Sequence, residues 1–190
     1  MIELLQIEDS VRELILAIGE DPQREGLIKT PQRIAEMFAE LTSGYRTSPE
    51  EVVNGAIFSV EYDEMVLIKD IEFYSLCEHH ILPFFGKVHV GYIPDGRVIG
   101  FSKIPRIVDV FAHRLQLQER MTEEIANFLM EAIKPQGVGV VVEGFHLCMA
   151  MRGVKKQDAR MITSAMKGIF RRDARTRAEF LQLIGQPVLK

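Results

Sequence analysis

Apolar residues recur at helical spacing in two stretches near the start of the chain, and both stretches predict amphipathic helices. The apolar positions are Val11, Leu14, Ile15 and Ile18, followed by Ile34, Met37, Phe38 and Leu41. A turn and a short helical stretch are expected within residues 47–58. We therefore predict a largely helical N-terminal segment over residues 1–60.

The pattern changes after residue 60, where runs rich in β-branched and aromatic residues appear. They flank two amphipathic stretches, in the order strand, strand, helix, helix, strand, strand. The expected ranges are 64–76, 86–94, 102–115, 122–135, 138–151 and 159–170. A helix over residues 174–184 is expected to follow. This order predicts an α+β fold for a domain that spans residues 61–190.

Composition and charge narrow the class of protein. The 190 residues are 47% hydrophobic and 26% charged, which is typical of a globular chain. A net charge of −4 argues against a broad nucleic-acid surface but permits a small anion in a local basic pocket. The N-terminus has no basic signal-peptide region, and no apolar run is long enough to span a membrane. We therefore expect a cytoplasmic protein with reduced thiols.

The four consecutive residues from Cys77 to His80 concentrate groups that bind metals or transfer protons. The whole chain holds only two cysteines and five histidines, so this clustering is informative. Cys77 and His80 have the short spacing of zinc ligands across a turn, although one such pair is a weak signal. Alternatively, Cys77 and Cys148 are buried structural thiols or form a disulfide.

Residues 138–151 supply a third ligand if they form one long strand. Side chains alternate along a strand, so the even positions place His146, Cys148 and Arg152 in a row on one face. The odd positions from 145 onward are all apolar. Buried polar groups without partners cost free energy, so we interpret the polar row as one wall of a site.

Cys77, His80 and Cys148 form a set of two thiolates and one imidazole, which resembles an open catalytic zinc site. His79 and His146 remain beside it as acid–base groups, because histidine titrates close to neutral pH. The alternative is a structural zinc site that uses His79 or His146 as its fourth ligand.

Basic residues open the first of the two central helices. Ser102 is expected to cap this helix, and Lys103 and Arg106 lie in its first turn, where the helix dipole disfavours cations. A bound phosphate would offset that cost and accept the free N–H groups of the helix. Arg152 would extend the site, because a strand from His146 to Arg152 spans on the order of 20 Å. The other interpretation is a set of solvated cations. No Gly-rich phosphate-binding loop of the P-loop type is present.

Glu119 precedes Thr122, the expected N-cap of the second central helix. In a site, its carboxylate could accept hydrogen bonds from N1–H and the 2-amino group of guanine, a pairing that adenine does not offer. Outside a site, it is a solvated loop carboxylate. Arg33 remains a candidate for anion binding because it lies in the first turn of a helix, whereas we interpret the later arginines as surface charges.

Four segments together resemble the GTP cyclohydrolase I family, and residues 19–45 are similar to the helical region with which that family begins. The segments are CEHHILPFFGKVHVGYIP, GFSKIPRIV, RLQLQERMT and FHLCMAMRG. The resemblance extends from residue 18 to residue 184, with several independent motifs in the same order. We expect no regulatory N-terminal extension of the kind that some family members carry.

The resemblance implies a tunnel-fold subunit in a homodecamer of two stacked pentameric rings, with sites at the subunit interfaces. It implies zinc-dependent hydrolysis of GTP to formate and 7,8-dihydroneopterin triphosphate, the first step of tetrahydrofolate and pterin biosynthesis. The implied zinc ligands are Cys77, His80 and Cys148.

The resemblance also assigns the remaining groups of the site. It implies His79 and His146 as proton-transfer groups, with Ser102 helping at the ribose. Glu119, with Gln118 nearby, is implied in guanine recognition. The implied contacts of the ribose and triphosphate are Ser102, Lys103, Arg106 and Arg152, joined by Arg33 from a neighbouring subunit.

Two other functions remain open from the sequence. One is another tunnel-fold enzyme that acts on a pterin or a 7-deazapurine, although a nitrile-reducing relative needs a nucleophilic cysteine rather than two metal-binding thiolates. The other is a non-catalytic module that binds a nucleotide and uses zinc only for stability. A metal without an exchangeable water, and no product from GTP, would identify that module.

Overall fold

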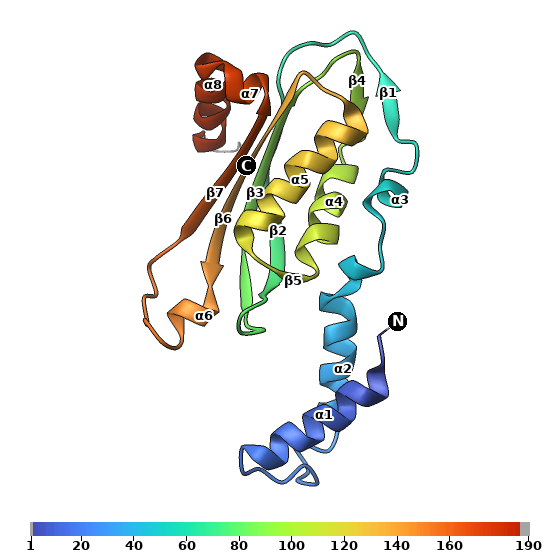
Figure 1. The fold of residues 1–190 in the computed structure, drawn as a ribbon, viewed down its shortest axis with the longest axis vertical. Helices are drawn as coiled ribbons and strands as arrows, with labels where there is room; N and C mark the ends of the chain where they lie inside the picture. The colour runs from blue at the N-terminus through green and yellow to red at the C-terminus, as the bar shows by residue number, and fades with distance from the viewer. Residues whose placement is uncertain (1, 187–190) are drawn as a thin grey trace.

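The computed structural model of the chain describes residues 2–186 (Figure 1). Its N-terminal part consists of a helical hairpin, a 3-10 turn, a short helix and a short strand. The elements are α1 (Leu4–Ala17), α2 (Thr30–Leu41), η1 (Ser43–Tyr45), α3 (Pro49–Val53) and β1 (Ile57–Ser59). The two predicted amphipathic helices are therefore confirmed, and β1 is an element that the pattern did not predict.

The rest of the chain forms one five-stranded sheet and the helices that cover it. The elements are β2 (Val66–Cys77), β3 (Pro83–Ile93), β4 (Arg97–Ile99), α4 (Lys103–Ala112), β5 (Leu115–Gln116), α5 (Gln118–Ile133), β6 (Gly137–His146), α6 (Leu147–Ala150), β7 (Met161–Gly168), α7 (Ile169–Arg172) and α8 (Ala174–Gly185). The sheet order is β5-β2-β3-β6-β7, and β4 pairs with β1 in a separate two-stranded sheet. The predicted α+β order of long strands and helices is confirmed.

The sheet topology brings two strand ends together. Both β2 and β6 run antiparallel to β3, so their C-terminal ends lie at the same end of the sheet, on either side of the start of β3. Phe84, near the start of β3, pairs with His146 at the end of β6. Cys77, the last residue of β2, therefore lies close to the residues that follow His146.

Helices α4 and α5 cover one face of the sheet (Figure 1). Alternate side chains of β3 and β6 point toward these helices, as the two-residue period of a strand requires. These are Phe84, Val88, Val90, Tyr92, Val138, Val140 and Val142, each at most 1% exposed. Burial of each such side chain contributes roughly 1.5–3 kcal/mol, so this face fixes the sheet on which the site is built.

A smaller core lies on the opposite face, at the end of the sheet away from Cys77. Phe170 of α7 and Phe180 of α8 are fully buried, and their ring centroids lie 5.4 Å apart. They pack over Gly91 and Gly139, which pair across β3 and β6. A Cβ at either glycine would come within 2.7 Å of a ring, so only glycine lets the rings contact the strand backbone.

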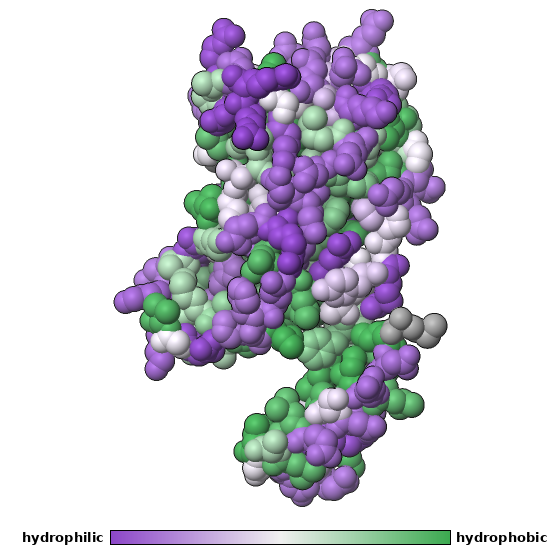
Figure 2. All heavy atoms as spheres, in the orientation of Figure 1, coloured by the Kyte–Doolittle hydropathy of each residue, from purple (hydrophilic) through white to green (hydrophobic). Residues whose placement is uncertain are grey.

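The hairpin of α1 and α2 projects beyond the end of the sheet and contacts it only through α2, which packs near β2 (Figure 1). Apolar side chains gather on its surface among the polar ones (Figure 2). Its exposed apolar residues include Leu5, Leu14, Leu16, Ile18, Ile28 and Met37. No helix within residues 2–186 combines the length and the apolar character needed to cross a membrane.

The predicted long strand over residues 138–151 is wrong in its second half. Strand β6 ends at His146 because its partner β3 begins at Pro83 and offers no pairing beyond Phe84. The chain then turns into α6, so Cys148 and Arg152 do not continue the strand face of His146. The span of about 20 Å expected for an extended strand from His146 to Arg152 therefore does not exist.

Two helix starts also differ from the prediction. Helix α5 begins at Gln118, four residues before the predicted cap Thr122, whose hydroxyl instead donates to the Gln118 carbonyl over 2.6 Å. Glu119 therefore lies in the first helical turn rather than in a loop. Ser102 does precede α4 as predicted, but its backbone is already helical and its side chain makes no capping hydrogen bond.

Candidate active site

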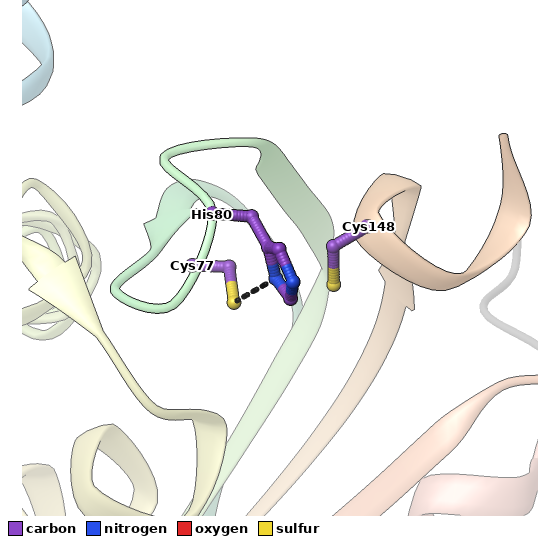
Figure 3. Close-up of side chains that lie close together, drawn as sticks. All are labelled: Cys77, His80 and Cys148. Atoms are coloured by element: carbon purple, nitrogen blue, oxygen red, sulfur yellow. Dashed lines mark hydrogen bonds between the residues drawn. The ribbon is translucent and has the colours of Figure 1, made fainter. Parts of the chain in front are cut away.

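A tight turn brings Cys77 and His80 together at the end of β2. The amides of His80 and Ile81 both donate to the Cys77 carbonyl, over 3.2 and 2.8 Å. Ile81 completes the turn with a φ of 55°, which non-glycine residues rarely adopt. As a result, Cys77 Sγ lies 3.9 Å from His80 Nδ1 (Figure 3).

Cys148 reaches the same point from α6. The ligand atoms of Cys77, His80 and Cys148 all lie within 4.8 Å of one another. Figure 3 shows the three side chains converging from the turn after β2 and from α6. Both cysteines are free thiols, so the alternative of a disulfide is wrong. The grouping predicted from sequence is confirmed, although a helical turn rather than a strand presents Cys148.

The three donors fit a zinc ion by their chemistry. Thiolate sulfur and imidazole nitrogen are the ligands zinc commonly takes, and a three-residue set leaves a fourth position open. Within the part of the chain that the structure describes, no other Cys, His, Asp or Glu joins this group at the same distance. The geometry therefore favours an open site over a four-ligand structural site that uses His79 or His146.

The charges around Cys148 suit a cation. Burial and the neighbouring Cys77 raise the pKa of the Cys148 thiol, whereas the positive charge of Arg152 lowers it. A metal cation bound between the two sulfurs would offset that effect, because a thiol that coordinates a metal binds as the thiolate. Arg152 follows α6 and is exposed, so its place in the site remains a prediction.

His146 is the last residue of β6 and lies two residues before Cys148 in the chain. Its ring stacks on Phe84 with the centroids 4.5 Å apart and the planes 7° from parallel. Burial lowers the pKa of His146, and the Glu119 carboxylate partly opposes that shift. Glu119 itself is exposed, so one helical turn places a solvent-facing carboxylate close to a half-buried imidazole.

The side chain of Gln118 is turned inward, which differs from the expected contact with guanine. It is 1% exposed, and its Oε1 lies 2.9 Å from His146 Nε2. No pattern in the sequence indicated this contact, because the predicted helix begins after residue 118 and leaves Gln118 in a loop. A helix that starts at Gln118 points its first side chain at the sheet and its second, Glu119, at solvent.

His79 and Glu78 complete the turn that carries Cys77. His79 is exposed, and its ring centroid lies 6.2 Å from that of His80. Glu78 forms an ion pair with Arg120 of α5, and its amide donates to the Gln116 carbonyl over 3.1 Å. These contacts fasten the metal-binding turn to the start of α5, the segment that carries Gln118 and Glu119.

The structure does not bring all predicted residues together within one chain. Ser102 and Lys103 lie at the end of α4 next to β4, whereas the opposite end of α4 leads to β5, which pairs with Cys77 (Figure 1). Arg106 is exposed one turn further along α4. Arg33 is exposed on α2, in the hairpin that projects beyond the end of the sheet. Within one chain, the three potential metal ligands and His146 are therefore separate from the basic residues Lys103, Arg106 and Arg33.

Comparison with known proteins identifies relatives along nearly the whole chain. The family model described as GTP cyclohydrolase I matches residues 7–185. GTP cyclohydrolase 1 of Campylobacter curvus is 57% identical over 180 residues, which cover 95% of this chain and 95% of the relative. GTP cyclohydrolase 1 of Chlorobaculum tepidum is 56% identical over 177 residues, which cover 93% of this chain and 79% of the relative. GTP cyclohydrolase 1 of Methylococcus capsulatus is 57% identical over 180 residues, which cover 95% of this chain and 97% of the relative.

Proposed function

The chain belongs to the GTP cyclohydrolase I family of enzymes, and we propose that it hydrolyses GTP to formate and 7,8-dihydroneopterin triphosphate with zinc at Cys77, His80 and Cys148. The observation that carries this proposal is the convergence of two thiols and an imidazole beside His146. Such a set suits hydrolysis, because a metal with an open position and a nearby acid–base group can together activate water.

Cys77, His80 and Cys148 would hold the zinc ion. When bound, zinc supplies Lewis acidity for the activation of water and the polarisation of the substrate. The thiols must stay reduced to bind it, which supports a cytoplasmic location.

His146 is the proposed proton donor to N7 of guanine, since it is the imidazole that lies half-buried beside the metal-binding group. Protonation of N7 makes C8 more electrophilic, so that this carbon can take up water and finally leave as formate. The freed amine then permits the ribose to open, rearrange and close onto nitrogen. His79 is exposed on the neighbouring turn and is our candidate for moving protons at the sugar, together with Ser102.

Glu119 is the proposed recognition group for guanine. Its exposed carboxylate lies within electrostatic reach of His146, so a base held by Glu119 would present its imidazole ring to that histidine. Arg152 is the proposed cation for the triphosphate from the same chain, because it lies near Cys148.

A complete site requires a second copy of the chain in this proposal. Ser102, Lys103, Arg106 and Arg33 lie away from the metal-binding group of their own chain, so we assign them to the triphosphate and ribose bound by a neighbouring subunit. Exposed apolar residues on the α1–α2 hairpin (Figure 2) support an assembly that covers them. We propose a homodecamer of two pentamers, in which residues 61–190 form a tunnel-fold catalytic domain and residues 1–60 a helical segment.

The test is to incubate the purified protein with GTP, with and without a zinc chelator, and to assay formate and pterin products. We expect both products, their loss on chelation and their return when zinc is added. A folded, metal-loaded protein that yields neither product would refute the proposal. That result would instead support a structural zinc module or a tunnel-fold enzyme for another substrate.

A further inference from the structure

The orientation of the Gln118 amide is fixed by its neighbours. Its nitrogen lies 3.1 Å from the carbonyl oxygen of Val142 and 3.0 Å from that of Met161. Both carbonyls can only accept hydrogen bonds, so this edge of the amide must be the NH₂ group. The other edge, the oxygen Oε1, therefore faces His146 Nε2 at 2.9 Å.

Two threonine hydroxyls reinforce this orientation. Thr122 commits its only hydroxyl hydrogen to the carbonyl of Gln118 over 2.6 Å. Thr163 Oγ1 lies 2.7 Å from Thr122 Oγ1 and must therefore donate to it. The Thr163 oxygen is left as an acceptor, 3.1 Å from the Gln118 nitrogen. The hydroxyl pair thus presents one more acceptor to the NH₂ edge.

Gly144 provides the space in which Oε1 lies. A Cβ at this position would come 2.1 Å from Gln118 Oε1 and 3.3 Å from His146 Nε2. Any larger residue would push the amide oxygen out of line with the imidazole. The His146 ring is also held in its plane, because it stacks on Phe84.

An amide oxygen has no hydrogen to give, so the hydrogen bond between Gln118 and His146 requires a proton on Nε2. We propose that Gln118 is a positioning residue that keeps His146 protonated on Nε2 and leaves Nδ1 as the nitrogen that exchanges a proton with the substrate. The inference rests on the proposed function, because it names the atom through which His146 acts. Gln118 thereby serves guanine chemistry without contacting guanine.

The direct test is solid-state NMR of the metal-loaded protein labelled with ¹⁵N-histidine. The His146 resonances are assigned by their absence from the spectrum of His146→Asn. We expect a protonated Nε2 and an unprotonated Nδ1 for neutral His146. A wild-type protein that turns over GTP and carries the proton of neutral His146 on Nδ1 would overturn this inference while leaving the proposed function intact. Absence of products from GTP would instead sink the proposed function, and the NMR result does not depend on turnover.

Two variants test the consequence for turnover. Gln118→Met keeps the length of the side chain and removes its hydrogen bonds, and we expect kcat to fall roughly 10–100-fold with KM for GTP nearly unchanged. Gly144→Ala keeps Gln118 but displaces its oxygen, so it should lower kcat in the same way and yield a mixture of His146 tautomers. Gln136→Met is the matched control, because this glutamine bonds to the Pro94 carbonyl at the other end of the sheet.

Whether the substitution of Gln118 changes kcat or KM decides between a positioning role and contact with the substrate. A rise in KM with unchanged kcat would mean that Gln118 contacts the substrate, and it would overturn the positioning role. Unchanged kcat and an unchanged tautomer in a folded Gln118→Met protein would overturn it as well. If Gln118→Met does not fold, Gly144→Ala and the wild-type NMR spectrum still decide.

Discussion

Replacement of His146 by alanine separates the proton chemistry of the site from its metal-binding group. The three proposed metal ligands are Cys77, His80 and Cys148, and among the residues that the structure describes His146 does not belong to this group. We therefore expect His146→Ala to bind one zinc ion per chain as the wild type does and to lose most of its turnover of GTP.

The size of both effects follows from the contacts of His146. General acid–base catalysis is worth about 10²–10⁴-fold in rate, or roughly 2.7–5.4 kcal/mol of activation free energy. Loss of the stacking on Phe84 costs about 0.5–1.5 kcal/mol of stability. The Gln118 oxygen left without a donor costs about 1–3 kcal/mol more. The sum of these two losses of stability is smaller than the free energy of unfolding of a typical domain, about 5–15 kcal/mol, so the variant should fold.

The assay measures kcat for formate release, zinc content by elemental analysis, and the free energy of unfolding for both proteins. His113→Ala is the matched control, because His113 bonds to Ser43 and has no place in the site. Wild-type kcat in zinc-loaded His146→Ala would refute the role of this imidazole. Loss of zinc together with activity would show that His146 supports the metal rather than the substrate.

Three further predictions concern zinc affinity, recognition of guanine and the pH dependence of stability. Cys148→Ser should lower zinc affinity by more than about 100-fold, which exceeds the loss typical when a residue that hydrogen-bonds to a metal ligand is removed. A metal titration that shows wild-type affinity would contradict this. Glu119→Gln should raise KM for GTP by roughly 5–150-fold, because a bidentate pairing is worth about 1–3 kcal/mol, and an unchanged KM would exclude the guanine contact. His89 is 3% exposed, and burial lowers its pKa below the ordinary 6.5, while Glu143 and Asp70 partly oppose the shift. The unfolded chain then binds more protons below about pH 6.5, so His89 contributes a loss of stability as pH falls through that value. Denaturation at several pH values should show a shallower dependence in His89→Gln, and an identical slope would refute this contribution.

The sequence predicted the grouping of the metal-binding residues better than the backbone that presents them. Cys77 and His80 are joined by a local turn, so their spacing alone indicated the pair. Cys148 was expected on a strand, because the odd positions from Phe145 to Met151 are all apolar. Where a strand ends depends on the strand with which it pairs. Strand β6 ends where its partner β3 begins, at Pro83, and the apolar pattern of residues 138–151 contains no information about that pairing.

The contacts of Gln118 show a second limit of sequence reasoning. Periodicity placed the start of α5 near Thr122, since the apolar stripe becomes clear only from Ile125 onward. A helix that begins at Gln118 buries that side chain against β6 and β7, where it finds Val142, Met161 and His146. These partners are 24 or more residues away in the chain, so only the folded sheet reveals them.

The most direct test of the whole account uses GTP labelled with ¹³C at C8 of guanine. The zinc-loaded protein should release the label as formate, in a one-to-one ratio with dihydroneopterin triphosphate, and removal of zinc should stop both products together. Label that remains in guanine, or pterin formed at the same rate without the metal, would contradict the assignment of Cys77, His80, Cys148 and His146 to this reaction.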